Sequence, residues 1–156
     1  MTNSDVAALF LELADLLDLA GELPFKAISY RKVALGLNDL GQSWREVVRT
    51  GSFDKIPGTG KAIREKLTTI YETGKLPTLE KWRQHPVAAF RPMLEAFSVS
   101  PRPLGLLVKK LEASSPENLM LKLKRSEDKK LGGQAGKVAQ QMLKVLMKVK
   151  RETDNA

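Results

Sequence analysis

The 156-residue chain contains no cysteine and a single histidine, His85. The absence of cysteine excludes disulfides, thiolate metal sites and cysteine nucleophiles, and one histidine cannot build a zinc centre or a Ser-His-Asp triad. No apolar run approaches membrane-spanning length, and the N-terminal stretch is acidic rather than basic. Because a secretion signal begins with a basic segment, we expect a cytoplasmic protein.

Positive charge is abundant and unevenly distributed. The formal net charge is +8 and the isoelectric point is about 9.8. Residues 1–80 hold 10 Lys+Arg and 11 Asp+Glu, whereas residues 81–156 hold 16 and 7. The excess of cations favours a polyanionic partner such as nucleic acid. The asymmetry predicts two subdomains, of which the second supplies most of the long-range attraction.

Apolar residues recur at helical spacing along the chain, and no alternating pattern predicts a strand, so we predict an all-α fold. Ser43 followed by Glu46 fits a capping box. A short helix is expected around Leu79 and Trp82. The other expected helices run from Val6 to Ala20, from Pro24 towards Gly41, from Ser43 to near Gly51, from Lys61 to Gly74, from Met93 to Phe97, from Leu104 to Leu111, from Pro116 to Leu123 and from Gly136 to Lys150.

The connector at residues 56–61, Ile-Pro-Gly-Thr-Gly-Lys, forms a tight turn between two expected helices. Gly58 and Gly60 permit a sharp turn and let the backbone approach a ligand without interference from a Cβ atom. Amides at the start of the following helix lack partners and attract an anion, to which Lys61 adds a formal charge. This geometry suits a nucleic-acid phosphate, and it equally suits a plain turn between packed helices.

The turn and its helix supply the first candidate contacts with DNA, and because these groups would touch only phosphates, binding should not depend on base sequence. The contacts are Gly58, Thr59, Gly60, Lys61 and Arg64. Two weaker copies follow. Residues 131–138 keep the glycines and place Lys137 near the start of a basic helix, and residues 97–104 carry serines where glycines are expected. Lys137 is therefore a further candidate contact.

Three segments, residues 25–32, 56–66 and 72–76, resemble in order and spacing the N-terminal region of family X DNA polymerases. The resemblance covers roughly residues 5–85. In that family the region is a helical bundle with a helix-hairpin-helix motif that binds the 5′-phosphate side of gapped DNA. The resemblance implies a partner of the same kind here: gapped, nicked or 5′-phosphorylated DNA, in repair.

The resemblance also implies roles for individual residues. Lys26 matches a phosphate-binding lysine, and Tyr30 and Arg31 belong to the same element. Lys66 matches the lysine with which some members form a Schiff base and remove a 5′-deoxyribose phosphate. The resemblance implies no required cofactor, although the family's hairpin can hold Na⁺ or K⁺ through backbone carbonyls. Here these would be the carbonyls of Asp54, Ile56 and Thr59.

Two small helical subdomains follow from these observations. Residues 1–85 are expected to form a family-X-like four-helix bundle that ends in the helix-hairpin-helix motif. Residues 75–92 contain three prolines and indicate a linker. Residues 90–156 are expected to form a basic helical region with degenerate copies of the motif.

The sequence departs from the family's pattern at three positions: Phe25 replaces a histidine, and Asp54 and Ala62 replace lysines. The anionic pocket is thereby poorer in charge, which weakens the case for lyase chemistry. The chain contains no Asp-x-Asp pair to hold two metal ions, so we do not expect a polymerase. Three functions stay open: sequence-independent DNA binding, a lyase that uses Lys66, and a protein-interaction module that has lost DNA binding.

Overall fold

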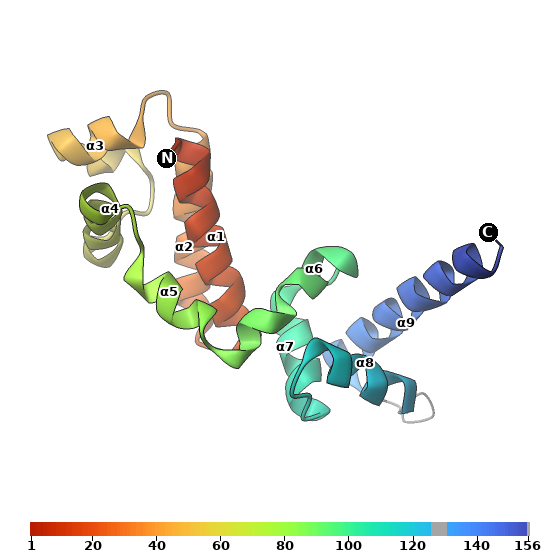
Figure 1. Cartoon of the computed structure of the whole chain (residues 1–156). Coiled ribbons are helices and arrows are strands. Elements are labelled where there is room, and N and C mark those ends of the chain that lie inside the picture. Colours follow the sequence, from red (N-terminus) through yellow and green to blue (C-terminus); the bar gives the residue numbers. More distant parts are fainter. Residues whose placement is uncertain (126–130, 156) are drawn as a thin grey trace. The chain divides into compact units, whose positions relative to one another are not determined.

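The computed structural model describes residues 1–125 and 131–155, and every regular element in these ranges is a helix (Figure 1). The predicted all-α class is therefore confirmed. The chain forms two compact units: Met1–Leu17 with Leu23–His85, and Asp18–Glu22 with Pro86–Ala156. Within the described ranges, no helix combines the length and the apolar character needed to cross a membrane.

The first unit is built on two long helices, α1 (Asn3–Leu19) and α2 (Pro24–Asn38). Pro24 provides a first residue whose fixed φ suits a helix start. The buried positions of both helices recur every three or four residues, as an amphipathic helix requires. Phe10 of α1 and Tyr30 of α2 meet in the core with their ring centroids 5.8 Å apart.

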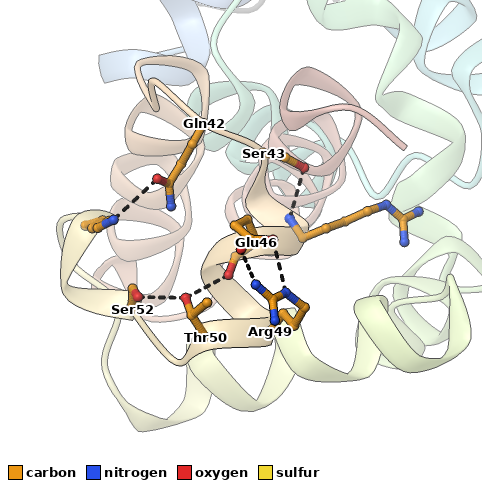
Figure 2. A network of polar contacts seen from close by, with 8 residues as sticks. Gln42, Ser43, Glu46, Arg49, Thr50 and Ser52 are labelled. Carbon is orange, nitrogen blue, oxygen red and sulfur yellow. Dashed lines mark hydrogen bonds and ion pairs between the residues drawn. The ribbon is translucent and has the colours of Figure 1, made fainter.

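The third helix, α3 (Trp44–Thr50), begins at the predicted cap, but its capping box is only half formed (Figure 2). The Ser43 hydroxyl accepts a hydrogen bond from the Arg45 amide at 3.3 Å. The Glu46 carboxylate does not return to the cap, because it accepts a hydrogen bond from Arg49 Nε at 3.1 Å. That hydrogen bond lowers the pKa of Glu46. Both side chains are exposed, so the pair adds little stability.

Trp44 fixes α3 to the beginning of the chain. Its indole Nε1 donates to the Met1 carbonyl at 2.9 Å, and its amide donates to Asn3 Oδ1 at 2.8 Å. Asn3 Nδ2 in turn donates to the carbonyl of Gln42 at 2.7 Å. The first residues of the chain are thus held by hydrogen bonds to residues 42–44.

The remaining elements of the first unit are η1 (Phe53–Lys55), α4 (Lys61–Thr73) and α5 (Pro77–Arg83). The helix α5 was expected within a linker, but it belongs to this unit. Leu79 is buried, and Arg83 makes two hydrogen bonds to the Glu12 carboxylate, at 2.6 and 2.7 Å. The first unit therefore contains five α-helices rather than the expected four.

The second unit contains η2 (Pro86–Phe90), α6 (Pro92–Ala96), α7 (Pro101–Lys110), α8 (Pro116–Arg125) and α9 (Gly133–Asp154). Its core forms mainly where α7 packs on α9. Residues 18–22 belong to this unit: Arg102 Nη2 donates to Asp18 Oδ1 at 2.9 Å, and Gly105 lies so close to the Leu19 carbonyl that a Cβ atom would collide with it.

Candidate nucleic-acid interface

The turn predicted at residues 56–60 joins η1 to α4. Ile56 is 1% exposed and anchors the turn in the core. Gly58 adopts a φ of +82°, a left-handed conformation that glycine tolerates at no steric cost. Gly36 of α2 lets the turn approach closely, since a Cβ atom there would be 3.1 Å from Pro57 Cδ. The turn is therefore held tightly against α2.

Thr59 closes the turn from within. Its side chain is largely buried, and its hydroxyl lies 2.7 Å from the carbonyl oxygen of Phe53 and 3.0 Å from that of Ile56. The hydroxyl carries one proton and donates it to these carbonyls. The sequence predicted Thr59 to be a DNA contact. In the structure its side chain stabilises the turn through internal hydrogen bonds.

The helix α4 begins with an uncapped amino end. Its cap residue is Gly60, which offers no side-chain acceptor, and the first return hydrogen bond is from the Arg64 amide to the Gly60 carbonyl at 3.0 Å. The amides of residues 61–63, in the first turn of α4, therefore have no carbonyl partner within the helix. They and the positive end of the helix dipole form a local anion-binding geometry.

A cavity of about 540 Å³ lies at this helix start. Four of the predicted contacts meet there. One acidic side chain, Glu65, also lines the cavity and offsets part of its positive charge. The lining residues are Thr59, Gly60, Lys61, Arg64, Glu65, Thr68 and Thr69.

Arg64 is held in place at the edge of this cavity. Its Nε donates to the Thr59 carbonyl at 3.0 Å, and its guanidinium carbon lies 5.5 Å from the centroid of the Phe53 ring. A guanidinium carries five N–H groups, so four remain for a ligand. Arg64 therefore combines a fixed position with donors suited to a phosphate.

Lys32 is a further cation of the site that the sequence did not assign. The aliphatic part of its side chain lies across Gly58, where an added Cβ atom would be 3.1 Å from Lys32 Cδ. Lys32 also lines a second cavity of about 370 Å³ together with Pro57 and Lys55. Lys32 falls within the helix expected from Pro24 towards Gly41, but the sequence gives no signal that it contacts the turn.

The other predicted contacts are not among the residues that line this cavity. Lys26 is exposed in the first turn of α2. Tyr30 is 7% exposed, and burial raises its pKa, so its side chain serves the core. Arg31 Nη2 donates to Asp15 Oδ1 at 3.0 Å, which offsets its charge. Lys137 is exposed near the start of α9, in the second unit.

Lys66, the candidate nucleophile, is half-buried on α4. Its Nζ lies 5.9 Å from the centroid of the Tyr30 ring. A cation–π contact stabilises the ammonium form, whereas a Schiff base requires the neutral amine. The contact therefore does not favour the chemistry that the resemblance implies. Within residues 1–125 and 131–155, no three acidic or histidine side chains are grouped to hold a metal ion.

Comparison with known proteins supports the interpretation of this region. Residues 1–76 match the family model of the helix-hairpin-helix domain. The chain is also similar to the DNA polymerase/3′-5′ exonuclease PolX of Bacillus subtilis (strain 168), with 26% identity over 136 residues. The alignment covers 87% of this chain and 23% of that protein, so the chain spans about a quarter of its relative's length. The resemblance to family X polymerases is thereby confirmed.

Proposed function

We propose, from the match of residues 1–76 to the helix-hairpin-helix family model, that the chain binds DNA through its backbone phosphates without reading base sequence. One observation carries the proposal. The uncapped start of α4, Lys61 and the fixed guanidinium of Arg64 line the same cavity. Their chemistry matches that of a phosphate, which accepts hydrogen bonds and carries negative charge.

The donors of this site do not discriminate between bases. Backbone amides and exposed cations recognise the phosphate backbone, which all sequences share, whereas base readout needs side chains that match donor and acceptor patterns in a groove. Lys32, whose side chain lies across Gly58, adds a third cation beside the turn. Affinity should therefore fall steeply with salt and vary little with sequence.

A preference for 5′-phosphorylated gapped or nicked DNA is the finer part of the proposal. A terminal phosphate carries a charge of about −1.5 to −2 at neutral pH, whereas an internal phosphate carries a single charge. Helix amides and nearby cations attract the more highly charged group more strongly. The similarity to a DNA polymerase supports a role in DNA metabolism such as repair.

The deciding experiment measures fluorescence anisotropy of labelled duplexes in several salt concentrations. It compares an intact duplex with a gapped duplex that carries a 5′-phosphate. The key variant is Gly60→Asp, because Gly60 has an extended backbone with open space around its Cα. The new carboxylate would accept the amide hydrogen bonds at the helix start and repel a phosphate.

We expect Gly60→Asp to weaken binding about tenfold, equivalent to about 1.4 kcal/mol, and to fold normally. The matched control is Ser43→Asp, which adds the same charge at the cap of another helix of the same unit, α3, at an exposed position that lines neither cavity. Equal affinities of the two variants would contradict the proposed site. An absence of salt-dependent binding to any DNA would contradict DNA binding itself and favour a protein-interaction module.

The lyase alternative requires a separate experiment. Borohydride reduction of the protein with a gapped abasic duplex would trap a Schiff base as a covalent adduct that disappears in Lys66→Ala. The contact between Lys66 and the Tyr30 ring leads us to expect no adduct. A lysine-dependent adduct would establish the lyase despite that contact.

A further inference from the structure

The carbonyl groups of the hairpin are already engaged by groups of the chain itself. The Thr59 carbonyl accepts a hydrogen bond from Arg64 Nε at 3.0 Å, and the Ile56 carbonyl lies 3.0 Å from the Thr59 hydroxyl. These are two of the three carbonyls that the family resemblance assigns to a monovalent cation. A cation that relies on carbonyl oxygens would have to share both with internal donors.

Arg64 brings a permanent positive charge to this position. A guanidinium stays protonated at all physiological pH values, and this one is further held over the Phe53 ring at 5.5 Å. A second cation at the Thr59 carbonyl would stand beside it, and like charges at such a distance repel. The residues present therefore do not fit a resident Na⁺ or K⁺.

We propose that the guanidinium of Arg64 takes the place of the monovalent cation, so that the hairpin needs neither Na⁺ nor K⁺. Arg64 then has two tasks. Its Nε satisfies the carbonyl that closes the turn, and its remaining N–H groups meet the phosphate. The second task rests on the proposed function, whereas the first does not.

The direct test is ²³Na relaxation measured on the full chain, with K⁺ as competitor. The wild-type protein should show no saturable Na⁺ contribution that K⁺ displaces. Arg64→Ala, which frees the Thr59 carbonyl, should show one. The control is Arg45→Ala, which removes another exposed guanidinium that lies over an aromatic ring, 5.1 Å from that of Trp44. A K⁺-displaceable Na⁺ site in the wild-type protein overturns the proposal.

The functional test measures DNA affinity in NaCl, KCl and tetramethylammonium chloride at equal ionic strength. Wild-type and Arg45→Ala affinities should each agree within about twofold across the three salts, because ionic strength alone then governs binding. Arg64→Ala should bind more weakly and become dependent on the cation. Wild-type binding that is more than about fivefold tighter in K⁺ than in tetramethylammonium overturns the proposal.

Thermal unfolding in the same three salts covers the case in which Arg64→Ala is destabilised. The wild-type midpoint should be the same in all three, since no cation is part of the fold. A midpoint raised specifically by Na⁺ or K⁺ overturns the proposal. If the chain binds no DNA in any salt, the proposed function fails, while the relaxation and unfolding measurements still decide the role of Arg64.

Discussion

The turns before α4 and α7 share a backbone geometry and differ in their chemistry. In each turn a residue with positive φ stands two positions before the helix cap: Gly58 (+82°) before Gly60, and Ser98 (+52°) before Ser100. The hydrogen bonds from the Ser98 and Val99 amides back to α6 show that the second turn also serves to end that helix. The weaker copy of the motif at residues 97–104 thus corresponds to a similarity in backbone conformation.

The second turn lacks the donors that the first presents. The helix α7 begins with Pro101, Arg102 and Pro103, and the two prolines carry no N–H group. Arg102 is engaged by Asp18 at 2.9 Å, and the position equivalent to Arg64 is Leu104, which is fully buried. The comparison shows that the turn alone does not supply the donors of the proposed phosphate site. The residues that follow the turn supply them.

The largest expected contrast concerns two glycines. Gly105→Ala should destabilise the second unit by about 3 kcal/mol, because its Cβ would collide with backbone at Leu19 and the helix would have to move. Gly60→Ala should cost about 1 kcal/mol or less, since an added Cβ atom would meet nothing within 4 Å and only the poorer capping by alanine counts. Urea denaturation followed by circular dichroism measures both. Similar losses in the two variants would show that the close approach of α7 to Leu19 does not resist a side chain at position 105.

The next contrast concerns two arginines. Arg102→Ala should destabilise the chain by about 2 kcal/mol, because it leaves the Asp18 carboxylate, 10% exposed, without this partner. Arg31→Ala should cost less than about 1 kcal/mol, since its partner Asp15 is 22% exposed and the pair is better solvated. The same denaturation series measures both. A larger loss for Arg31→Ala would reverse our ranking of the two ion pairs.

A third contrast places the same acid at both caps. Gly60→Asp should weaken DNA binding about tenfold, whereas Ser100→Asp should change it less than about twofold, because the prolines of α7 leave few amides for a phosphate. Anisotropy titrations in one buffer compare the variants. Equal losses would mean that both turns bind phosphate, or that the added charge acts at long range.

The smallest expected effect is a gain. Ser98 holds a positive φ that costs a non-glycine residue about 1 kcal/mol. Ser98→Gly should therefore stabilise the chain by up to that amount, after subtraction of the greater freedom of glycine in the unfolded state. DNA affinity should stay unchanged. A gain in DNA affinity would instead indicate that the serine prevents the second turn from acting like the first.

Local features of the sequence predicted the helices and the first turn correctly. Periodic apolar residues locate α1, α2 and α4, and Gly74 ends α4 in the left-handed conformation that its position predicts. The motif at residues 56–66 predicted the match to the helix-hairpin-helix family model. These features depend on residues within a few positions of one another, which is why the sequence alone reveals them.

Contacts between residues far apart in the chain could not be predicted from the sequence. Nothing in the Tyr30-Arg31 element indicates that the first side chain enters the core while the second pairs with Asp15. The contact of Lys32 with Gly58 joins residues 26 positions apart and depends on how α2 packs against the turn. The Glu46 side chain had two partners within reach, its own cap and Arg49, and only the structure shows which one it takes.

The conformation of Gly60 bears on how this sequence can change during evolution. A single nucleotide substitution converts a glycine codon that ends in a pyrimidine to an aspartate codon. Aspartate at a helix cap stabilises the helix by about a few tenths of a kcal/mol relative to glycine. The open space around Gly60 offers no steric resistance to that change. Selection for a stable fold alone therefore does not keep glycine at position 60. A lineage that no longer needs the uncapped helix start would lose Gly60 early and become slightly more stable as it did so.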